Sequence, residues 1–274
     1  MHIYIPSAFR PDYRLGRGVL AQLPEDIVPR LVVPRDEFVD YHCIVRDLGL
    51  RAKIIPHTEV GLPMTKRWIA EYALAQGERS FCMMDDDIWL LVRRAEDTWR
   101  LRNAEHDDIR QMVEWMTRKI DEVEYASISL REGNNHHGIG SVDDLVAPYG
   151  RSCRVHCYRT AEFLKLEHGR CELHEDFDCN LQILESGGTM AISGWFAQGQ
   201  RMMNEPGGCA TYRTHERQEA SARKLAELHP GIVSLRTTRN KTDADGMGTR
   251  VEPTIQWKLA WERGQRHRQE LIGA

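Results

Sequence analysis

The first half of the chain alternates short apolar runs with segments of helical character, and this alternation limits the possible folds more than any other feature. The helical segments are predicted at residues 39–49 and 64–77, and each ends at a glycine. The apolar runs are rich in β-branched or bulky residues and are predicted to be strands, at residues 2–6, 30–34, 52–56 and 80–84. The alternation predicts a largely parallel sheet covered by helices.

The second half continues the α/β pattern. Residues 107–123 place apolar side chains at helical spacing behind Asp107 and Asp108, which predicts a core helix. Strands are expected at residues 124–130, 154–158 and 190–196, and helices at 178–186, near 216–228 and near 254–271. No internal repeat or low-complexity tract is present. We therefore expect one domain, with a core over residues 1–200 and a helical C-terminal extension over residues 201–274.

Charge is distributed unevenly along the chain. The net charge of −4 argues against a protein that simply coats nucleic acid. Residues 1–200 hold 24 Lys and Arg against 32 Asp and Glu, whereas residues 201–274 hold 13 against 9. The C-terminal quarter is therefore locally basic. Arginine accounts for 30 of the 37 basic residues, a ratio that fits phosphate recognition but that a skewed genomic composition also produces.

The sequence predicts a soluble intracellular protein without a membrane anchor. No apolar run approaches the roughly 20 residues needed to cross a bilayer, and the N-terminus has neither a basic leader nor a cleavage site. The seven cysteines are odd in number and show no CxxC spacing. Neither a disulfide framework nor a zinc ribbon is indicated.

Three consecutive aspartates follow the apolar run at residues 80–84. In extended backbone, Asp85 and Asp87 face one side and Asp86 the other. Acids crowded at the carboxyl end of a strand repel one another, and this edge is where open α/β sheets bind ligands. A divalent cation removes the conflict, and carboxylate oxygens suit Mg²⁺ or Mn²⁺. The alternative interpretation is a solvated turn or a helix cap.

A second acidic group directly precedes the helix predicted at residues 178–186. It contains Glu175, Asp176 and Asp178. Capping explains one acid at a helix start but not several. A carboxylate at a helix N-terminus is kept ionised by the helix dipole, which suits a general base. For any single one of these acids, a capping role stays open.

Two further segments carry candidate ligand-binding residues. Gly61, Lys66 and Arg67 belong to a helix start where cations oppose the helix dipole, which favours a phosphate-bearing ligand there. Further on, paired glycines at 207–208 precede Arg213 and His215. The histidine could complete a metal site or hold a phosphate with Arg213, although a lone histidine is more often an ordinary residue.

The order of these motifs resembles the nucleotide-sugar glycosyltransferases of the GT-A fold over residues 1–200. The resemblance rests on the strand at 2–6 followed by Ser7, Phe9 and Arg10, and on the segments 61–67, 85–87 and 175–176. The whole chain, including residues 207–215 and 236–241, resembles the TET-associated glycosyltransferases of bacteriophages. Members of that family are thought to add sugars to hydroxymethylated pyrimidines in phage DNA. The resemblance implies a Rossmann-like α/β core with a mostly parallel or mixed sheet.

The resemblance also implies roles for individual residues. Asp85 and Asp87, completed by His215, would hold Mn²⁺ or Mg²⁺. The base would be Asp176, with Glu175 or Asp178 as substitutes. The donor, expected to be a UDP-sugar, would be bound by Arg10, Gly61, Lys66, Arg67, Asp85, Asp86 and Arg213. Direct displacement would invert the anomeric centre, while a retaining reaction stays open.

The acceptor implied by the resemblance is 5-hydroxymethylpyrimidine in phage DNA, modified in the host cytoplasm. The target base would have to leave the stack, and the basic C-terminal quarter would contact backbone phosphates through Arg236, Arg239, Lys241 and Arg250. Three alternatives remain open. The acceptor could be a polysaccharide, protein or small molecule; the acids could form a two-metal nuclease or nucleotidyltransferase site; or the chain could be a binding module whose acids are caps.

Overall fold

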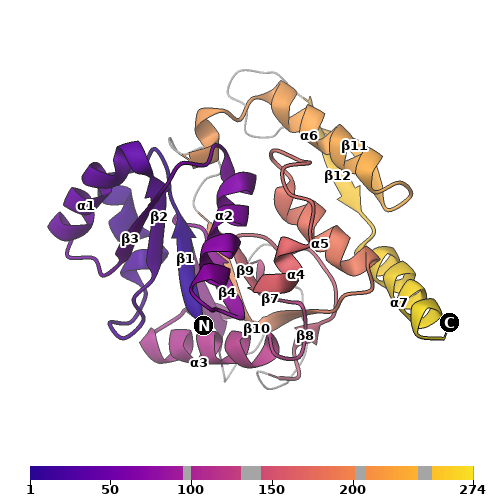
Figure 1. Cartoon of the computed structure of the whole chain (residues 1–274), viewed down its shortest axis with the longest axis horizontal. Helices are drawn as coiled ribbons and strands as arrows, with labels where there is room; N and C mark the ends of the chain where they lie inside the picture. Colours follow the sequence, from indigo (N-terminus) through magenta and orange to yellow (C-terminus); the bar gives the residue numbers. More distant parts are fainter. Residues whose placement is uncertain (95–99, 131–142, 201–207, 240–248, 274) are drawn as a thin grey trace.

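The computed structural model of the chain is a central β-sheet with helices on both faces (Figure 1). It describes residues 1–94, 100–130, 143–200, 208–239 and 249–273. No helix among these residues is both long and apolar enough to cross a membrane.

The central sheet contains ten strands within the described residues. Their bounds are β1 His2–Pro6, β2 Arg30–Pro34, β3 Lys53–His57, β4 Ser80–Met84, β5 Ile88–Arg93, β6 Leu101–Asn103, β7 Tyr125–Leu130, β8 Val146–Ala147, β9 Val155–Arg159 and β10 Met190–Gln200. The strands β1 to β4 match the four predicted in the first half to within one residue, as do β7 and β9 later in the chain, while β10 extends four residues beyond its predicted end at 196. The strands β5, β6 and β8 have no predicted counterpart in the sequence.

The strand order is β3-β2-β1-β4-β9-β7-β10-β5-β6, with β8 paired to β10. Neighbouring strands from β3 to β4 are parallel. Their order is that of the first half of a Rossmann fold. From β9 onward the sheet is mixed, because β9 runs antiparallel to both β4 and β7, while β10 is parallel to β7 and antiparallel to β5. The predicted α/β class with a mixed sheet is confirmed.

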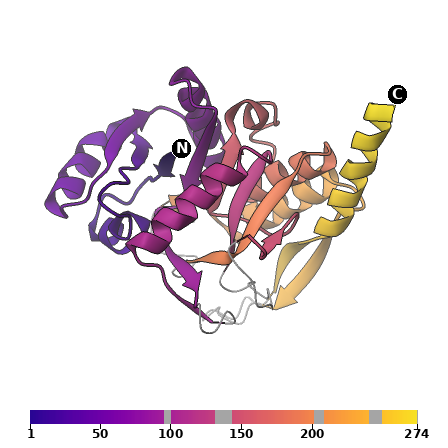
Figure 2. The same ribbon diagram turned by 90° about the horizontal axis from the view of Figure 1, so that it is seen from below.

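Side chains of successive strand residues enter two separate cores, one on each face of the sheet. In β1, Ile3 and Ile5 face one core, and Tyr4 faces the other, as the alternation of a strand requires. The first core is covered by α1 (Phe38–Asp47) and α3 (His106–Lys119). The second is covered by α2 (Leu62–Ala75), α4 (Thr160–Leu164) and α5 (Glu175–Glu185). Figure 2 shows α3 lying along its face of the sheet.

The C-terminal segment adds two helices and a hairpin to the α5 side of the sheet (Figure 1). The helices, α6 (His215–Leu228) and α7 (Trp257–Gly273), confirm the two predicted there. Between them, β11 (Val233–Arg239) and β12 (Thr249–Ile255) form an antiparallel pair. This hairpin was not predicted, because its residues are polar and their alternation is too weak to distinguish a small surface sheet from a loop.

The helix α7 packs closely on α5 at a glycine. A Cβ atom on Gly264 would lie only 1.7 Å from the carbonyl oxygen of Leu184. Beyond this contact α7 extends away from the body of the protein (Figure 2). The absence of a side chain at Gly264 therefore lets the C-terminal helix approach the backbone of the helix that carries the second acidic group.

We expect Gly264→Ala to lower the free energy of unfolding by about 1–3 kcal/mol, because the added methyl group must push the two helices apart. Chemical denaturation measures this change. Gly273→Ala, in the same helix but with open space around the added carbon, is the matched control and should not destabilise. A Gly264→Ala protein as stable as the control would contradict the close packing.

Candidate active site

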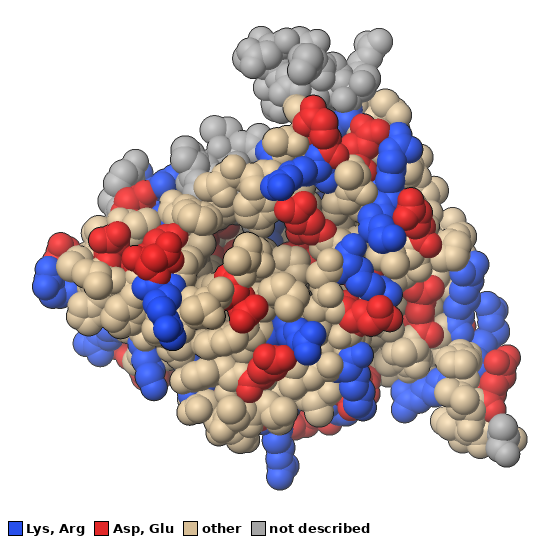
Figure 3. Space-filling view, turned by 45° about the horizontal axis from the view of Figure 1, so that its top comes forward, with Lys and Arg blue, Asp and Glu red and all other residues tan. Residues whose placement is uncertain are grey.

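The candidate site lies at the sheet edge where the parallel strands β1 and β4 end. Such an edge binds ligands in open α/β sheets. Because β9 is antiparallel to β4, its first residues lie at the same edge. The starts of α2 and α5 also meet there, since Lys66 of α2 contacts Glu175 of α5. Figure 3 shows a hollow in this side of the molecule, with acidic and basic side chains intermixed around it.

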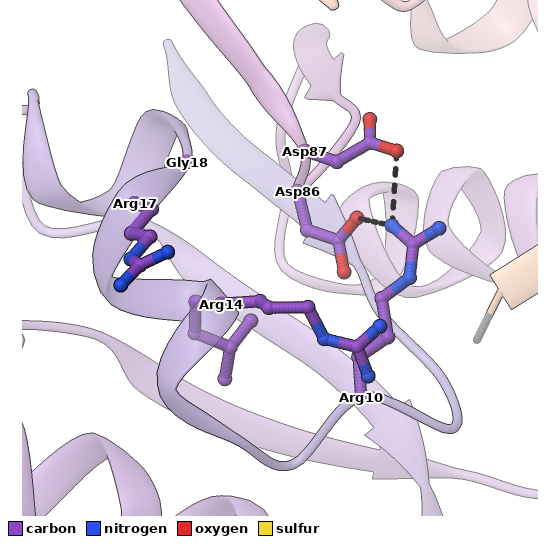
Figure 4. Close-up of a pocket in the computed structure, with 7 residues that line it drawn as sticks. Arg10, Arg14, Arg17, Gly18, Asp86 and Asp87 are labelled. Carbon is purple, nitrogen blue, oxygen red and sulfur yellow. Dashed lines mark hydrogen bonds and ion pairs between the residues drawn. The ribbon is translucent and has the colours of Figure 1, made fainter. Parts of the chain in front are cut away.

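One charged cluster joins the loop after β1 to the acidic turn after β4. The guanidinium of Arg10 donates from Nη1 to Asp86 Oδ1 at 2.8 Å and to Asp87 Oδ2 at 3.0 Å (Figure 4). The hydroxyl of Ser7 also donates to Asp86. Gln200, at the end of β10, donates to both carboxylate oxygens of Asp87 at 3.1 Å. Two of the three aspartates therefore share one cation.

The three aspartates do not point as extended backbone would require. The strand β4 ends at Met84, and Asp86 and Asp87 lie in a turn before β5. For this reason Asp87 shares Arg10 with Asp86, and the extended backbone expected for residues 85–87 is not formed. Burial raises the pKa of Asp86 to about 6, despite the nearby guanidinium of Arg10.

Asp85 lies between the two charged clusters of the site. Its backbone N–H donates to the carbonyl of Arg154 at 2.9 Å, and Arg154 has a positive φ of 70°. Burial raises the pKa of Asp85 well above its usual value, and Asp87 and Asp176 add to the rise while Lys66 opposes it. The negative charge of an ionised Asp85 is therefore only partly balanced by the nearby cation Lys66.

The loop after β1 forms a pocket against the acidic turn (Figure 4). Its charged lining comes from Arg10, Arg14, Arg17, Asp86 and Asp87. Gly18 closes one side, where an added Cβ would lie 1.9 Å from the carbonyl oxygen of Asp86. Only glycine permits this approach, so the loop and the turn are fitted to each other. Arg10 is paired with Asp86 and Asp87, and Arg14 with Asp12, so an anionic ligand, which guanidinium groups suit, would compete here with carboxylates.

A second charged cluster surrounds Asp176. The buried Lys66 donates to Asp176 Oδ1 and, at 3.1 Å, to Glu175 Oε1. His156 Nε2 lies 3.2 Å from the same oxygen of Asp176. Burial alone would raise the pKa of Asp176, but Lys66 and His156 hold it well below its usual value. Asp176 is therefore an ionised carboxylate at neutral pH, as a general base must be.

The other two acids of α5 have different surroundings. The helix begins at Glu175, three residues before the predicted start, so Glu175 and Asp176 belong to its first turn. Burial raises the pKa of Glu175. Asp178 points to another group of side chains, where it accepts hydrogen bonds from Arg170 at 2.6 Å and His229 at 2.9 Å. Of the three predicted candidates, Asp176 combines ionisation with a place at the sheet edge.

Several predicted ligand-binding residues do not join these clusters. Gly61 is the N-cap of α2, with a φ of 80°, and Arg67 pairs with Glu71 along the exposed face of that helix at 2.9 Å. Lys66 faces the carboxylates of α5 and not an open anion site, which corrects its predicted role in donor binding. Lys66 is buried, and its ammonium is bound by Glu175 and Asp176 of α5.

The predicted metal ligands do not form a preassembled cluster. Among the described residues, no group of three or more His, Cys, Asp or Glu side chains could hold a metal ion. The set of Asp85, Asp87 and His215 is therefore not assembled, with His215 at the first position of α6. Arg213 lies in the turn before that helix.

The basic residues expected to contact DNA lie on or beside the C-terminal hairpin. Arg236 and Arg250 occupy the two strands, and both contact Glu252, at 3.4 and 2.7 Å. Arg239 is the last residue of β11. Lys241 lies outside the described residues. The hairpin thus presents arginine side chains, although part of their charge is balanced by one glutamate.

Besides Arg14 and Arg17 of the pocket, three polar residues of the site were missed in the sequence. His156 is one residue of an ordinary apolar strand, and Gln200 lies beyond the predicted end of β10. The hydroxyl of Tyr41, in α1, lies 2.8 Å from Ser7 Oγ and accepts from the N–H of Arg10 at 3.2 Å. None carries a local signal, because each acts through a partner distant in sequence.

Comparison with known proteins assigns the class. The sequence model of the TET-associated glycosyltransferases matches residues 1–208. The chain therefore belongs to the TET-associated glycosyltransferase family. This confirms the predicted family, its α/β fold and the enzyme class, a glycosyltransferase. A search of curated proteins found no match.

The chain is also similar to solved structures, at low sequence identity. One is TarS from S. aureus, residues 1–349 in complex with UDP, with 12% identity and a TM-score of 0.42 over 83% of this chain and 65% of that chain. A nucleotide-diphospho-sugar transferase from Desulfovibrio desulfuricans, given as putative, has 9% identity and a TM-score of 0.43 over 83% and 99%. A glucose-1-phosphate thymidylyltransferase from Bacillus anthracis, also given as putative, has 12% identity and a TM-score of 0.41 over 72% of this chain and 88% of that chain. The chain thus spans less than two thirds of the TarS fragment.

We expect Lys66→Met to destabilise the protein by about 3–5 kcal/mol at pH 7, because two buried carboxylates lose their cation. In the wild type, Lys66 holds the pKa of Asp176 below its unfolded value, so this stabilisation persists at neutral pH. In the variant the carboxylate pKa values rise above their unfolded values of about 4, and the penalty disappears as acid protonates them.

Denaturation at pH 7 and near pH 4 therefore tests the charge cluster, and the difference between the two proteins should shrink at the lower pH. Lys224→Met is the control, because Lys224 makes an exposed ion pair with Glu227 at 3.4 Å and such pairs contribute little. A stability difference independent of pH would mean that Lys66 acts through packing alone.

Proposed function

We propose that this glycosyltransferase moves a sugar from a nucleotide-sugar donor to an acceptor hydroxyl, with Asp176 as the general base. One observation carries the proposal. The ionised carboxylate of Asp176 lies at the same sheet edge as the arginine pocket formed by the loop after β1. A base and an anion site on one edge are what transfer from a diphosphate leaving group requires.

The donor diphosphate would bind in the pocket of Arg10, Arg14 and Arg17. Guanidinium groups match phosphate geometry and stay charged at every physiological pH. The same loop carries Phe9, which is 55% exposed and has a positive φ of 58°. An exposed aromatic ring held in a strained backbone conformation beside the pocket supports a role in contacting the donor.

A divalent cation fits this site through Asp87. Mg²⁺ and Mn²⁺ are commonly held by one or two carboxylates, with phosphate and water in the remaining positions, so the lack of a three-residue cluster among the described side chains is compatible with such an ion. Asp87 is partly exposed and adjoins the arginine pocket; Asp85 and His215 stay as predicted further ligands. When bound, the ion would neutralise charge on the leaving diphosphate.

The reaction proposed is a single displacement. The acceptor oxygen attacks the anomeric carbon while Asp176 removes the hydroxyl proton, and the bond from that carbon to the diphosphate oxygen breaks. The electron pair of this bond leaves with the nucleoside diphosphate, and the configuration at the sugar inverts. Lys66 keeps Asp176 ionised before the reaction.

The acceptor we propose is a 5-hydroxymethylpyrimidine in DNA, which would place the reaction in the host cytoplasm. Two observations support it: membership of the TET-associated family and the excess of basic over acidic residues after residue 200. Phosphate contacts from Arg236 and Arg250 of the hairpin would bind the backbone without reading sequence. The target base would have to be extruded to reach Asp176.

We expect Asp176→Asn to lower the transfer rate by about 10²–10⁴-fold, the usual contribution of a general base. Hydroxymethylated DNA is incubated with a panel of nucleotide sugars, and its nucleosides are analysed by mass spectrometry for a hexose or pentose increment. Glu172→Gln is the control, because Glu172 is an exposed acid four residues earlier. An active Asp176→Asn enzyme would exclude Asp176 as the base, and no increment with any donor would exclude this acceptor.

Binding of the donor diphosphate is testable without an acceptor. UDP with Mn²⁺ should raise the melting temperature of the wild type. At a UDP concentration a hundred times its Kd, binding stabilises the folded protein by about 2.7 kcal/mol. Asp87→Ala should lose most of this shift because the ion loses its carboxylate ligand. Asp40→Ala removes an exposed acid of α1, and this variant should keep the full shift in melting temperature. Equal shifts in both variants would argue against a metal at Asp87.

A further inference from the structure

Two arginine side chains near the start of α5 have no acidic partner. They are Arg151, in the segment before β9, and Arg213, just before α6. Within the described residues, neither guanidinium forms an ion pair or a hydrogen bond. Arg217, four residues after Arg213, is by contrast paired with Glu172 at 3.5 Å. The charges of Arg151 and Arg213 are therefore available to a ligand from outside the chain.

Arg151 lies over an aromatic ring of the helix that carries the proposed base. Its Cζ atom is 5.7 Å from the centroid of the Phe177 ring, which is within the range of a cation–π contact. Phe177 directly follows Asp176, and Arg151 itself is exposed. Because stacking uses the face of the guanidinium, its N–H groups stay free to donate in the plane. The ring thus holds an accessible donor group close to the base.

Arg213 approaches the same helix start from the C-terminal segment. Both arginines act on His174, the N-cap of α5. Burial lowers the pKa of His174 to about 4, and the positive charges of Arg213 and Arg151 add to this lowering. The negative charges of Glu252 and Asp176 act in the opposite direction. His174 is therefore neutral at pH 7, and the two guanidinium groups converge on it without being balanced by it.

These groups lie on the side of α5 that faces the C-terminal segment. The Nδ1 atom of His174 is 3.0 Å from Ser221 Oγ in α6, and the ring of Phe177 packs edge-on against Trp257 at the start of α7. The proposed donor pocket belongs instead to the loop after β1 and the acidic turn after β4. The two unpaired arginines are therefore placed for the acceptor and not for the donor.

We propose that Arg151 and Arg213 together bind a backbone phosphate of the DNA acceptor next to the target nucleotide. The inference rests on the proposed function, because it takes DNA as the acceptor and Asp176 as the base. Guanidinium groups match phosphate oxygens, and such contacts fix the register of a duplex without reading its sequence. The hairpin arginines share Glu252, whereas this pair gives up no internal ion pair when a phosphate binds.

The salt dependence of DNA binding tests the pair in the whole protein. Fluorescence anisotropy of a hydroxymethylated duplex is measured from about 50 to about 200 mM salt. Arg151→Ala and Arg213→Ala should each reduce the slope of log K against log salt by about 0.9, the contribution of one phosphate contact, which is a roughly eightfold loss of affinity at about 0.1 M salt. An unmodified duplex should lose affinity equally. Arg151→Lys keeps the charge and should recover most of the slope.

Arg110→Ala is the matched control for loss of an exposed arginine. Arg110 pairs with Asp26 at 2.7 Å and belongs to α3, which covers the opposite face of the sheet from α5. This variant should keep the wild-type salt slope. If the slope is unchanged in Arg151→Ala and Arg213→Ala, or falls as much in the control, the proposed phosphate site is overturned.

Binding of UDP with Mn²⁺ distinguishes a backbone phosphate from the donor diphosphate. Arg151→Ala and Arg213→Ala should keep the wild-type shift in melting temperature, and loss of that shift would assign the arginines to the donor and overturn the inference. In the transfer reaction, the KM for DNA should rise by about eightfold, while kcat at saturating DNA stays within about twofold of the wild type.

The same measurements separate failure of this inference from failure of the proposed function. If the wild type neither binds nor modifies hydroxymethylated DNA, the proposed acceptor fails and the phosphate site fails with it. If the wild type modifies this DNA and both arginine variants do so with unchanged KM and salt slope, only the inference on Arg151 and Arg213 fails.

Discussion

The ion pairs of the buried Lys66 with Glu175 and Asp176 tie the two halves of the molecule together at the site. Lys66 comes from the helix after β3, in the parallel half, and its partners come from the helix that precedes β10, in the mixed half. Buried charges are tolerated only when they are paired, and removing one partner is costly. The positions of α2 and α5 across the sheet edge are therefore coupled. The carboxylate that we propose as the base has its ionisation set by the same contact that fixes its helix.

The topology of the sheet explains how a mixed arrangement serves one site. The parallel strands bring the loop after β1 and the acidic turn after β4 to a common edge, as in any Rossmann-like half. The antiparallel β9 contributes its first residues to this edge, and this places His156 beside Asp176. The end of β10 brings Gln200 to Asp87. Strands that break the parallel pattern thus supply the polar side chains that support the two charged clusters.

The sequence predicted what depends on local pattern and missed what depends on distant partners. The bounds of β1 and β2 were predicted to the residue because apolar runs closed by proline have few alternatives. The acidic residues at 85–87 were recognised, but the extended backbone expected for them is replaced by a turn at Asp86 and Asp87. Lys66 was assigned to the donor because a helix start predicts an anion site, whereas its partners lie 109 and 110 residues away. His156 carried no signal at all, since only the fold places it beside a carboxylate.

The balance of charge at the site bears on donor binding. The two clusters and Asp85 together hold five carboxyl groups, Asp85, Asp86, Asp87, Glu175 and Asp176, against the two cations Arg10 and Lys66. If all were ionised, the site would carry a formal charge of −3. Burial raises the pKa values of Asp85, Asp86 and Glu175, and the neighbouring carboxylates add to the rise. A diphosphate would add further negative charge to the same edge. Arg17 also lines the pocket, whereas the charge of Arg14 is balanced by Asp12; a divalent cation at Asp87 would offset much of the added charge. The acidity of the site thus favours a donor that binds together with its own cation over one that binds as a bare anion.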